Sequence, residues 1–349
     1  MKKIRWALIG VGAFSPARGA ANAIAYAHAE GLKRNSDTFE LTGACSLIRK
    51  NLDDFSAEYP CHTYLDMLEL FRKEKPDGVS ISTYAAAREE HVIAAIQAGV
   101  KFIMIEKPLA LSLKAIAHME SEAKKYGARL FVNFQRRYGA PFRRAKETVQ
   151  SGKIGKVFHI ELRQPCSNSL DFGPHFINSA LFFIGEKMPL SLTASADGMH
   201  EVPWHGMLTE KRMEASITFA DQLNITYSAS PDNSPDLPVI RIDGEKGFAE
   251  LYMKKKEDMN SVFCCGNAAG IENPTTDENF HHGDNDRFLF FEYCYKDIAQ
   301  AIRSGGPALV DLEYGIRTQR ILLAMYASAQ THRRIIFGKN ETDPEFRFL

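Results

Sequence analysis

The chain has 349 residues, of which 45% are hydrophobic and 25% charged, and its formal net charge is zero. This length predicts two domains, and the composition is ordinary for a globular enzyme. A neutral chain has no global field that attracts nucleic acid or an anionic membrane, so we expect neither as a partner.

An apolar strand from Ile4 leads directly into a Gly-x-Gly turn. A first Gly permits a tight turn, and a second lets backbone N–H groups approach a pyrophosphate at a helix N-terminus. Pro16 follows the third small position, so we expect a longer loop than usual before a helix over 19–32. The residues of this loop expected to contact a dinucleotide are Gly10, Gly12, Ala13, Phe14 and Ser15.

The first third of the chain alternates strands and helices, which is typical of a parallel, doubly wound sheet. Further strands are expected over 39–45, 78–82, 100–105 and 129–134, and helices over 51–58, 67–73, 90–98 and 112–126. The fold class is therefore α/β, with a dinucleotide-binding Rossmann domain over residues 1–134.

From about residue 152 the pattern changes to period-two alternation, which indicates a mostly antiparallel open sheet. We assign residues 135–349 to an α+β domain for substrate binding and oligomerisation. Apolar strand residues predict an outer face that needs cover, and so a homodimer or homotetramer. The residues named for that face are Ile217, Phe219, Ile225 and Tyr227.

Glu106 and Lys107 close the expected strand 100–105 and precede Pro108. Open α/β sheets bind ligands outside the carboxyl ends of their strands, so both side chains should point into a cleft. A second ionisable pair follows later, because Asp171 and His175 are four residues apart and share a face on a helix. A His beside a carboxylate is a typical general base. The alternatives are a surface ion pair at Glu106 and Lys107, and a helix cap with a packing His at the second pair.

The end of the second strand bears on the form of the dinucleotide. A NAD enzyme usually presents Asp or Glu there, but this chain has Ser46, followed by Arg49 and Lys50. We therefore favour NADP over NAD, the alternative being a solvated basic helix start. The segment His281–Asp286 has metal-ligand residue types, but adjacent His residues rarely bind one ion, and we expect no metal.

The six cysteines include no C-x-x-C pair, so we expect reduced thiols and a cytoplasmic protein. Residues 1–14 superficially resemble a signal peptide. We favour a strand there, because cleavage near Ala20 would remove Gly10 and Gly12.

Several motifs occur in an order that resembles the Gfo/Idh/MocA oxidoreductases, which include glucose–fructose oxidoreductase and inositol dehydrogenase. They are Gly10-x-Gly12, Thr83 after the third strand, Glu106-Lys107-Pro108, Asn133–Tyr138, Asp171-x-Gly-x-His175 and the final helix around Ala324–Ala329. The resemblance covers nearly the whole chain, and the combination is specific although each motif alone is not.

The resemblance implies an NAD(P)-dependent oxidoreductase that acts on a hydroxyl of a sugar, polyol or inositol. His175 would take the hydroxyl proton, the hydride on that carbon would pass to the nicotinamide, and Lys107 would stabilise the reacting oxygen. Asp171 would orient the substrate or the base. It also places Thr83, Tyr84 and Glu106 near the cofactor, and Gln135, Arg136 and Asn178 near the substrate.

Some positions depart from the family pattern. Tyr84 and Arg88 stand where the family usually has Pro and His, and Asn178 stands where it often has Asp. Cys166–Ser169 replaces a Gly-rich stretch, so the substrate pocket is remodelled. The alternatives to a dehydrogenase are a glycosidase that oxidises transiently with a tightly held NAD, and a non-catalytic dinucleotide sensor. Lys107 and His175 argue against the sensor, which needs no general base.

Overall fold

The computed structural model describes residues 2–13, 24–234, 236–253, 261–267, 270–275 and 288–348. The chain forms two compact units. The first comprises residues 1–110, 114–135 and 288–315, and the second comprises residues 111–113, 136–287 and 316–349. We expected all residues after 134 in one domain, whereas residues 288–315 make their contacts within the first unit.

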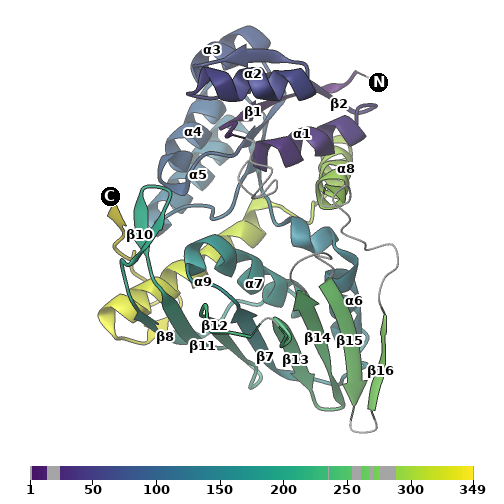
Figure 1. Cartoon of the computed structure of the whole chain (residues 1–349), viewed down its shortest axis with the longest axis vertical. Helices are drawn as coiled ribbons and strands as arrows, with labels where there is room; N and C mark the ends of the chain where they lie inside the picture. Colours follow the sequence, from purple (N-terminus) through teal and green to yellow (C-terminus); the bar gives the residue numbers. More distant parts are fainter. Residues whose placement is uncertain are drawn as a thin grey trace. The chain divides into compact units, whose positions relative to one another are not determined.

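The first unit is built on a parallel sheet in which β1 and β4 are the two central strands. Figure 1 shows β1 and β2 of this sheet. Among the described residues its order is β3-β2-β1-β4-β5-β6. The strands are β1 (Ile4–Ile9), β2 (Phe39–Cys45), β3 (His62–Tyr64), β4 (Gly78–Ile81), β5 (Phe102–Ile105) and β6 (Arg129–Val132). The strand order reverses between β1 and β4, where doubly wound sheets bind their ligands. The predicted Rossmann sheet is confirmed.

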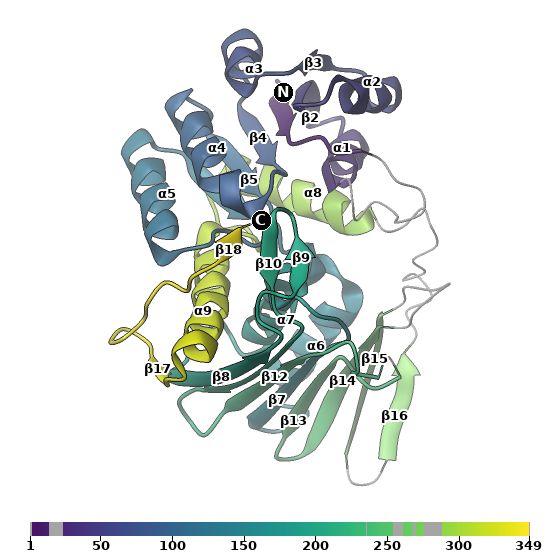
Figure 2. The same ribbon diagram turned by 60° about the vertical axis from the view of Figure 1, so that its left-hand side comes forward.

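Helices connect these strands, and one helix joins them from much later in the chain. They are α1 (Ile24–Arg34), α2 (Arg49–Glu58), α3 (Met67–Glu74), α4 (Ala85–Gln97), α5 (Leu113–Tyr126) and the late helix α8 (Leu289–Ser304). Figure 2 shows α1 and α8 side by side. Gly31 permits this approach, because a Cβ there would lie 2.7 Å from the Tyr295 ring and 2.9 Å from Cβ of Phe291.

The second unit holds a mixed, mostly antiparallel sheet, as expected. Its order in the described part of the chain is β16-β15-β14-β13-β7-β12-β11-β8-β17, with β7 and β12 parallel. The strands are β7 (Val157–Gln164), β8 (Ser191–Asp197), β11 (Arg212–Thr218), β12 (Asn224–Ala229), β13 (Ile240–Gly244), β14 (Gly247–Met253), β15 (Ser261–Asn267), β16 (Gly270–Thr275) and β17 (Ile335–Ile336). A small separate sheet contains β9 (Val202–Trp204), β10 (Met207–Thr209) and β18 (Arg347–Phe348).

Helices cover one face of the large sheet (Figures 1 and 2). They are α6 (Ala140–Gln150), α7 (Ser169–Phe183) and α9 (Leu312–Thr331), and the short helix η2 (Gln135–Tyr138) precedes α6. The strands alternate buried and more exposed residues, as in the pattern of β12, where Ile225, Tyr227 and Ala229 are buried. None of the described helices is long and apolar enough to cross a membrane.

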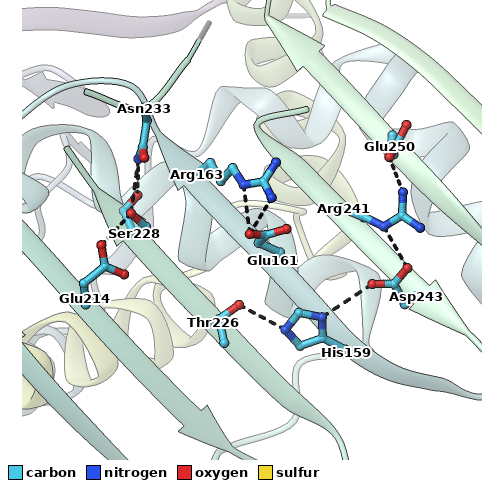
Figure 3. A network of polar contacts seen from close by, with 10 residues as sticks. All are labelled: His159, Glu161, Arg163, Glu214, Thr226, Ser228, Asn233, Arg241, Asp243 and Glu250. Carbon is cyan, nitrogen blue, oxygen red and sulfur yellow. Dashed lines mark hydrogen bonds and ion pairs between the residues drawn. The ribbon is translucent and has the colours of Figure 1, made fainter. Parts of the chain in front are cut away.

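The other face of the sheet is polar, which corrects the expected apolar outer face. Ile217, Phe219, Ile225 and Tyr227 are each at most 2% exposed, and the Tyr227 hydroxyl packs against Gly173 of α7. Successive residues of a strand point to opposite faces of the sheet, so the residues next to these four in sequence form the outer face. Figure 3 shows the polar network there. It pairs His159 with Thr226 and Asp243, Arg163 with Glu161, and Arg241 with Asp243 and Glu250.

Candidate active site

The turn after β1 packs closely against the backbone that follows β4. Gly10 has a φ of +91°, and a Cβ there would lie 2.9 Å from backbone atoms of Ser82 and Thr83. The Gly10 and Val11 amides donate to the carbonyl of Cys45 at the end of β2. Gly12 and Ala13 follow in irregular structure. The other two loop residues named from the sequence, Phe14 and Ser15, lie outside the described residues.

Ser46, at the end of β2, fixes the same turn. Its hydroxyl is buried and donates to the carbonyl of Val11 at 2.7 Å, and it accepts the amide of Ile48 at 3.3 Å. Arg49 is exposed at the first residue of α2, where its guanidinium donates to Thr63 Oγ1 at 3.2 Å. The first turn of α2 contains no acidic residue. Ser46 therefore shapes the turn, while Arg49 presents a cation beside it.

The loop after β4 is held by a buried arginine. Arg88 of α4 donates to the carbonyls of Thr83 and Pro108, so it joins the loops that follow β4 and β5. Burial lowers the pKa of this guanidinium to about 10, although the charge of Glu106 opposes the shift. The Thr83 hydroxyl lies 2.9 Å from His91 Nδ1, and the neighbouring Tyr84 ring is 59% exposed. Arg88 thus ties together the loops that carry Thr83 and Lys107.

Glu106 and Lys107 follow β5, as predicted. Glu106 is buried, and its Oε1 atom lies 2.9 Å from His28 Nε2 and 2.5 Å from Asn133 Nδ2. Its Oε2 atom accepts the Lys107 amide at 3.3 Å. Burial raises the pKa of this carboxyl, but the hydrogen bonds from His28 and Asn133 and the charge of Lys107 outweigh burial and lower the pKa below its ordinary value. Glu106 is therefore a buried anion that orders the backbone of Lys107, and it is not a surface ion pair.

Unsatisfied oxygen atoms gather where the sheet ends. Ser82 Oγ, Asn133 Oδ1 and Gln135 Oε1 are buried and have no hydrogen-bond partner among the described residues. Ser82 follows β4, and Asn133 and Gln135 follow β6, so all three lie at the carboxyl ends of the strands. Buried polar groups normally have partners, so these atoms fit a polar ligand at this edge. Together with the cradle at Gly10, they fit a dinucleotide.

Asp171 and His175 lie on α7 of the second unit. Asn168 caps this helix, because its side chain accepts the amides of Leu170 at 3.1 Å and Asp171 at 3.2 Å. His175 is 6% exposed, and Asp171 is half-buried. Four residues of helix separate them, so they share a face, as the sequence predicted. The helix begins at Ser169 and continues through Pro174.

Glu210 also holds the start of α7, and no sequence pattern indicated this residue. This residue follows β10 and is completely buried. One carboxylate oxygen accepts the Ser169 amide, and the other accepts the Tyr326 hydroxyl, each at 2.5 Å. Burial raises the pKa of the Glu210 carboxyl, and the hydrogen bonds from Tyr326 and Ser169 oppose that rise only in part. No local pattern announces such a residue, because its partners are 41 and 116 positions away.

The residues expected near the substrate divide into two kinds. Arg136 lies over the ring of Phe176, 5.4 Å from its centroid, next to the His175 position. Asn178 is 2% exposed, accepts from Arg137 Nε at 2.7 Å and donates to Thr318 at 2.9 Å. These contacts favour a packing role for Asn178. Arg136 remains a candidate for substrate binding, and the segment His281–Asp286 lies outside the described residues.

Two family models match the chain. The model described as an oxidoreductase family with an NAD-binding Rossmann fold matches residues 4–134. The model of that family's C-terminal alpha/beta domain matches residues 146–336. Together these matches span most of both structural units.

Individual relatives agree with this result. A myo-inositol 2-dehydrogenase of Thermotoga maritima is 37% identical over 111 residues, which cover 31% of this chain and 33% of the relative. The match thus spans about a third of that enzyme. A D-glucoside 3-dehydrogenase of Escherichia coli is 23% identical over 75% of this chain and 79% of its own. Among solved structures, the WlbA dehydrogenase of Bordetella pertussis, in complex with NADH and UDP-GlcNAcA, has a TM-score of 0.76 at 19% identity, covering 97% of this chain and all of that one.

Proposed function

Because the chain belongs to the Gfo/Idh/MocA oxidoreductase family, we propose that it is an NAD(P)-dependent dehydrogenase acting on a hydroxyl of a sugar, polyol or inositol. Two curated relatives are named for inositol and glucoside dehydrogenation. The observation that carries the proposal is that each unit holds one pair of ionisable residues in place. In the first unit, Lys107 follows Glu106, whose carboxylate accepts the Lys107 amide. In the second unit, Asp171 and His175 lie near the capped start of α7.

Each group has a defined task in this reaction. His175 accepts the proton of the substrate hydroxyl, and Asp171, on the same helix face, orients the substrate or the ring. Lys107 donates to the reacting oxygen and stabilises its developing negative charge. Gly10, Gly12, Ala13, Thr83 and Tyr84 hold the dinucleotide, with Arg136 available to the substrate. The dinucleotide, when bound, supplies the hydride chemistry.

A substrate panel tests the proposal. Sugars, inositols, polyols and glycosides should be mixed with NAD or NADP, and the absorbance of reduced nicotinamide followed. At least one polyhydroxylated compound should give sustained reduction of the dinucleotide. Cleavage of a glycoside without net reduction would identify the glycosidase chemistry instead. A chain that binds the dinucleotide but turns over no compound in the panel would contradict a dehydrogenase.

The cofactor form gives a specific prediction. NADP should bind at least as tightly as NAD, because no carboxylate at the end of β2 opposes a 2′-phosphate and Arg49 is exposed there. A hydrogen bond to a charged group contributes about 1.5–3 kcal/mol, so Arg49→Ala should weaken NADP binding about 10–100-fold and leave NAD nearly unchanged. Titration with the reduced forms NADPH and NADH, followed by their fluorescence, measures both affinities. Lys50→Ala is the control, since Lys50 pairs with Asp54. A NAD preference that persists in Arg49→Ala would contradict the NADP form.

Assembly gives a second prediction. We propose a homodimer or homotetramer that uses the polar open face of the large sheet, where acidic and basic residues alternate (Figure 3). Arg163→Glu would place two acids together, because Arg163 pairs with Glu161 at 2.7 Å, and should shift the assembly toward the monomer. Lys125→Glu, on α5 beside Glu122, is the control. Sedimentation showing only a 39.1 kDa species of the wild type at micromolar concentration would contradict the oligomer.

A further inference from the structure

A continuous chain of hydrogen bonds runs from Glu106 into the core of the first unit. His28 Nε2 lies 2.9 Å from Glu106 Oε1, and His28 Nδ1 lies 2.9 Å from the Tyr295 hydroxyl. That hydroxyl lies 2.6 Å from Ser80 Oγ, which accepts the indole N–H of Trp6 at 2.9 Å. All five residues are at most 5% exposed. The five side chains are called the His28 relay below.

The relay joins parts of the chain that are far apart in sequence. Trp6 lies on β1, Ser80 on β4, His28 on α1 and Tyr295 on α8, while Glu106 follows β5. Because Gly31 has no side chain, α8 can approach α1 closely. The centroids of the Tyr295 and His28 rings are 5.9 Å apart. The return of residues 288–315 to the first unit therefore supplies one member of the relay.

The indole of Trp6 sets the direction of every bond in the relay. An indole N–H can only donate, so Ser80 Oγ accepts from Trp6. Within the described chain, the remaining contact of the Ser80 hydroxyl is the Tyr295 hydroxyl, so the Ser80 proton has an acceptor there only if Ser80 donates to Tyr295. Tyr295 then donates to His28 Nδ1, which must carry no proton. In this arrangement Nδ1 of His28 accepts from Tyr295, and the Nε2–H group of His28 faces Glu106.

The opposite direction is less favourable. A doubly protonated His28 would donate from Nδ1 to Tyr295, and Tyr295 would donate to Ser80. Ser80 would then accept from both Trp6 and Tyr295, and its own proton would lack an acceptor in the described core. Buried hydroxyl groups rarely stay unsatisfied in this way.

The Glu106 end of the relay lies next to the lysine that the proposed function uses. Glu106 Oε1 is fixed by His28 and Asn133, and Oε2 accepts the Lys107 amide at 3.3 Å. Both carboxylate oxygens of Glu106 therefore accept hydrogen bonds, and the carboxylate cannot rotate without breaking one of them. We propose that His28 is a positioning residue that, held in one tautomer by Tyr295, fixes Glu106 and thereby the Lys107 segment for catalysis. This inference rests on the proposed function of Lys107.

The tautomer and the order of the segment are measured without turnover. Nitrogen NMR of the wild type should show an unprotonated Nδ1 and a protonated Nε2 for His28, assigned by the loss of its signals in His28→Gln. Tyr295→Phe should change those signals. Hydrogen exchange at the Lys107 amide should be faster in His28→Leu and Tyr295→Phe, but not in Tyr64→Phe. Tyr64 is the matched control, because its buried hydroxyl contacts the carboxylate of Glu74 instead.

Kinetics then separate positioning from simple stability. Misplacement of a reacting group by about 1 Å can cost about 10²-fold in rate, so His28→Leu should lower kcat about 10–100-fold with little change in KM. His28→Gln keeps an N–H donor toward Glu106 and should restore most of the rate. Equal kcat in His28→Leu and Tyr64→Phe, a proton on Nδ1 in the wild type, or unchanged exchange at Lys107 would each overturn the inference. A wild-type protein without turnover would overturn only the proposed function. The NMR and hydrogen-exchange results would still show whether His28 orders the Lys107 segment.

Discussion

Replacing His175 with alanine should lower turnover by about 10²–10⁴-fold, the usual contribution of a general acid–base group. His175 is nine-tenths buried on the capped helix α7. Alanine at this position removes the imidazole, and Asp171 is then the only ionisable residue on this face of the described helix. Dinucleotide affinity should be nearly unchanged, because the Gly-rich turn belongs to the other unit. Turnover is followed by nicotinamide absorbance and affinity by titration.

The control for this variant is His118→Ala. His118 is exposed on α5, and its Nδ1 atom lies 2.7 Å from the carboxylate of Glu89. Its replacement should leave both turnover and affinity unchanged, as is usual for a surface ion pair. Near-full turnover in His175→Ala would show that His175 is a packing residue, and the proposed reaction would need another base.

Replacing Glu210 with alanine should have the largest effect on stability. The substitution leaves the Ser169 amide and the Tyr326 hydroxyl buried without their acceptor. Each unsatisfied group costs about 1–3 kcal/mol, so the free energy of unfolding should fall by about 2–6 kcal/mol. The rate should fall as well, because α7 carries both Asp171 and His175. Thermal denaturation and turnover measure the two effects. Wild-type stability in Glu210→Ala would contradict this role for Glu210.

Glu210→Gln gives the matched control and a dependence on pH. An amide can accept from Ser169 and donate to Tyr326, so this variant should remain folded and active. Burial raises the pKa of Glu210 in the folded chain, so the folded state holds this proton more tightly than the unfolded state. The stabilisation that the raised pKa of Glu210 contributes is fully present below about pH 4.3, the pKa of an unperturbed Glu. It is lost as the pH rises through the raised pKa of the folded state. Denaturation at a series of pH values should show a smaller loss of stability in Glu210→Gln than in the wild type.

The sequence predicted the parts of the fold that depend on local pattern. The apolar strand before Gly10, the strand before Glu106 and the helix spacing of Asp171 and His175 all carry short-range signals, and each lies where expected. Period-two alternation also indicated the mostly antiparallel sheet of the second unit. It did not say which face was covered, and Tyr227 proved to face α7 while Thr226 faces outward.

The parts that depend on distant contacts were not predictable in this way. Tyr295 reaches His28 across 267 positions, and Tyr326 reaches Glu210 across 116. Asn178 looked like a substrate contact because of its position after His175, yet Arg137 and Thr318 take its side chain. Local periodicity cannot reveal such pairs, because only the tertiary fold brings them together. The same limit explains why the contacts of the helix Leu289–Ser304 with the first unit were not predicted.

The joint action of Lys107 and His175 on one substrate hydroxyl is tested by a double-mutant cycle in turnover. Lys107→Ala and His175→Ala are measured alone and together, with a dinucleotide titration of each variant to confirm binding. Groups that act as a unit give losses that do not multiply, so the double variant should be no more than about tenfold slower than the slower single variant. Single losses that multiply fully in the double variant would show that the two residues act independently.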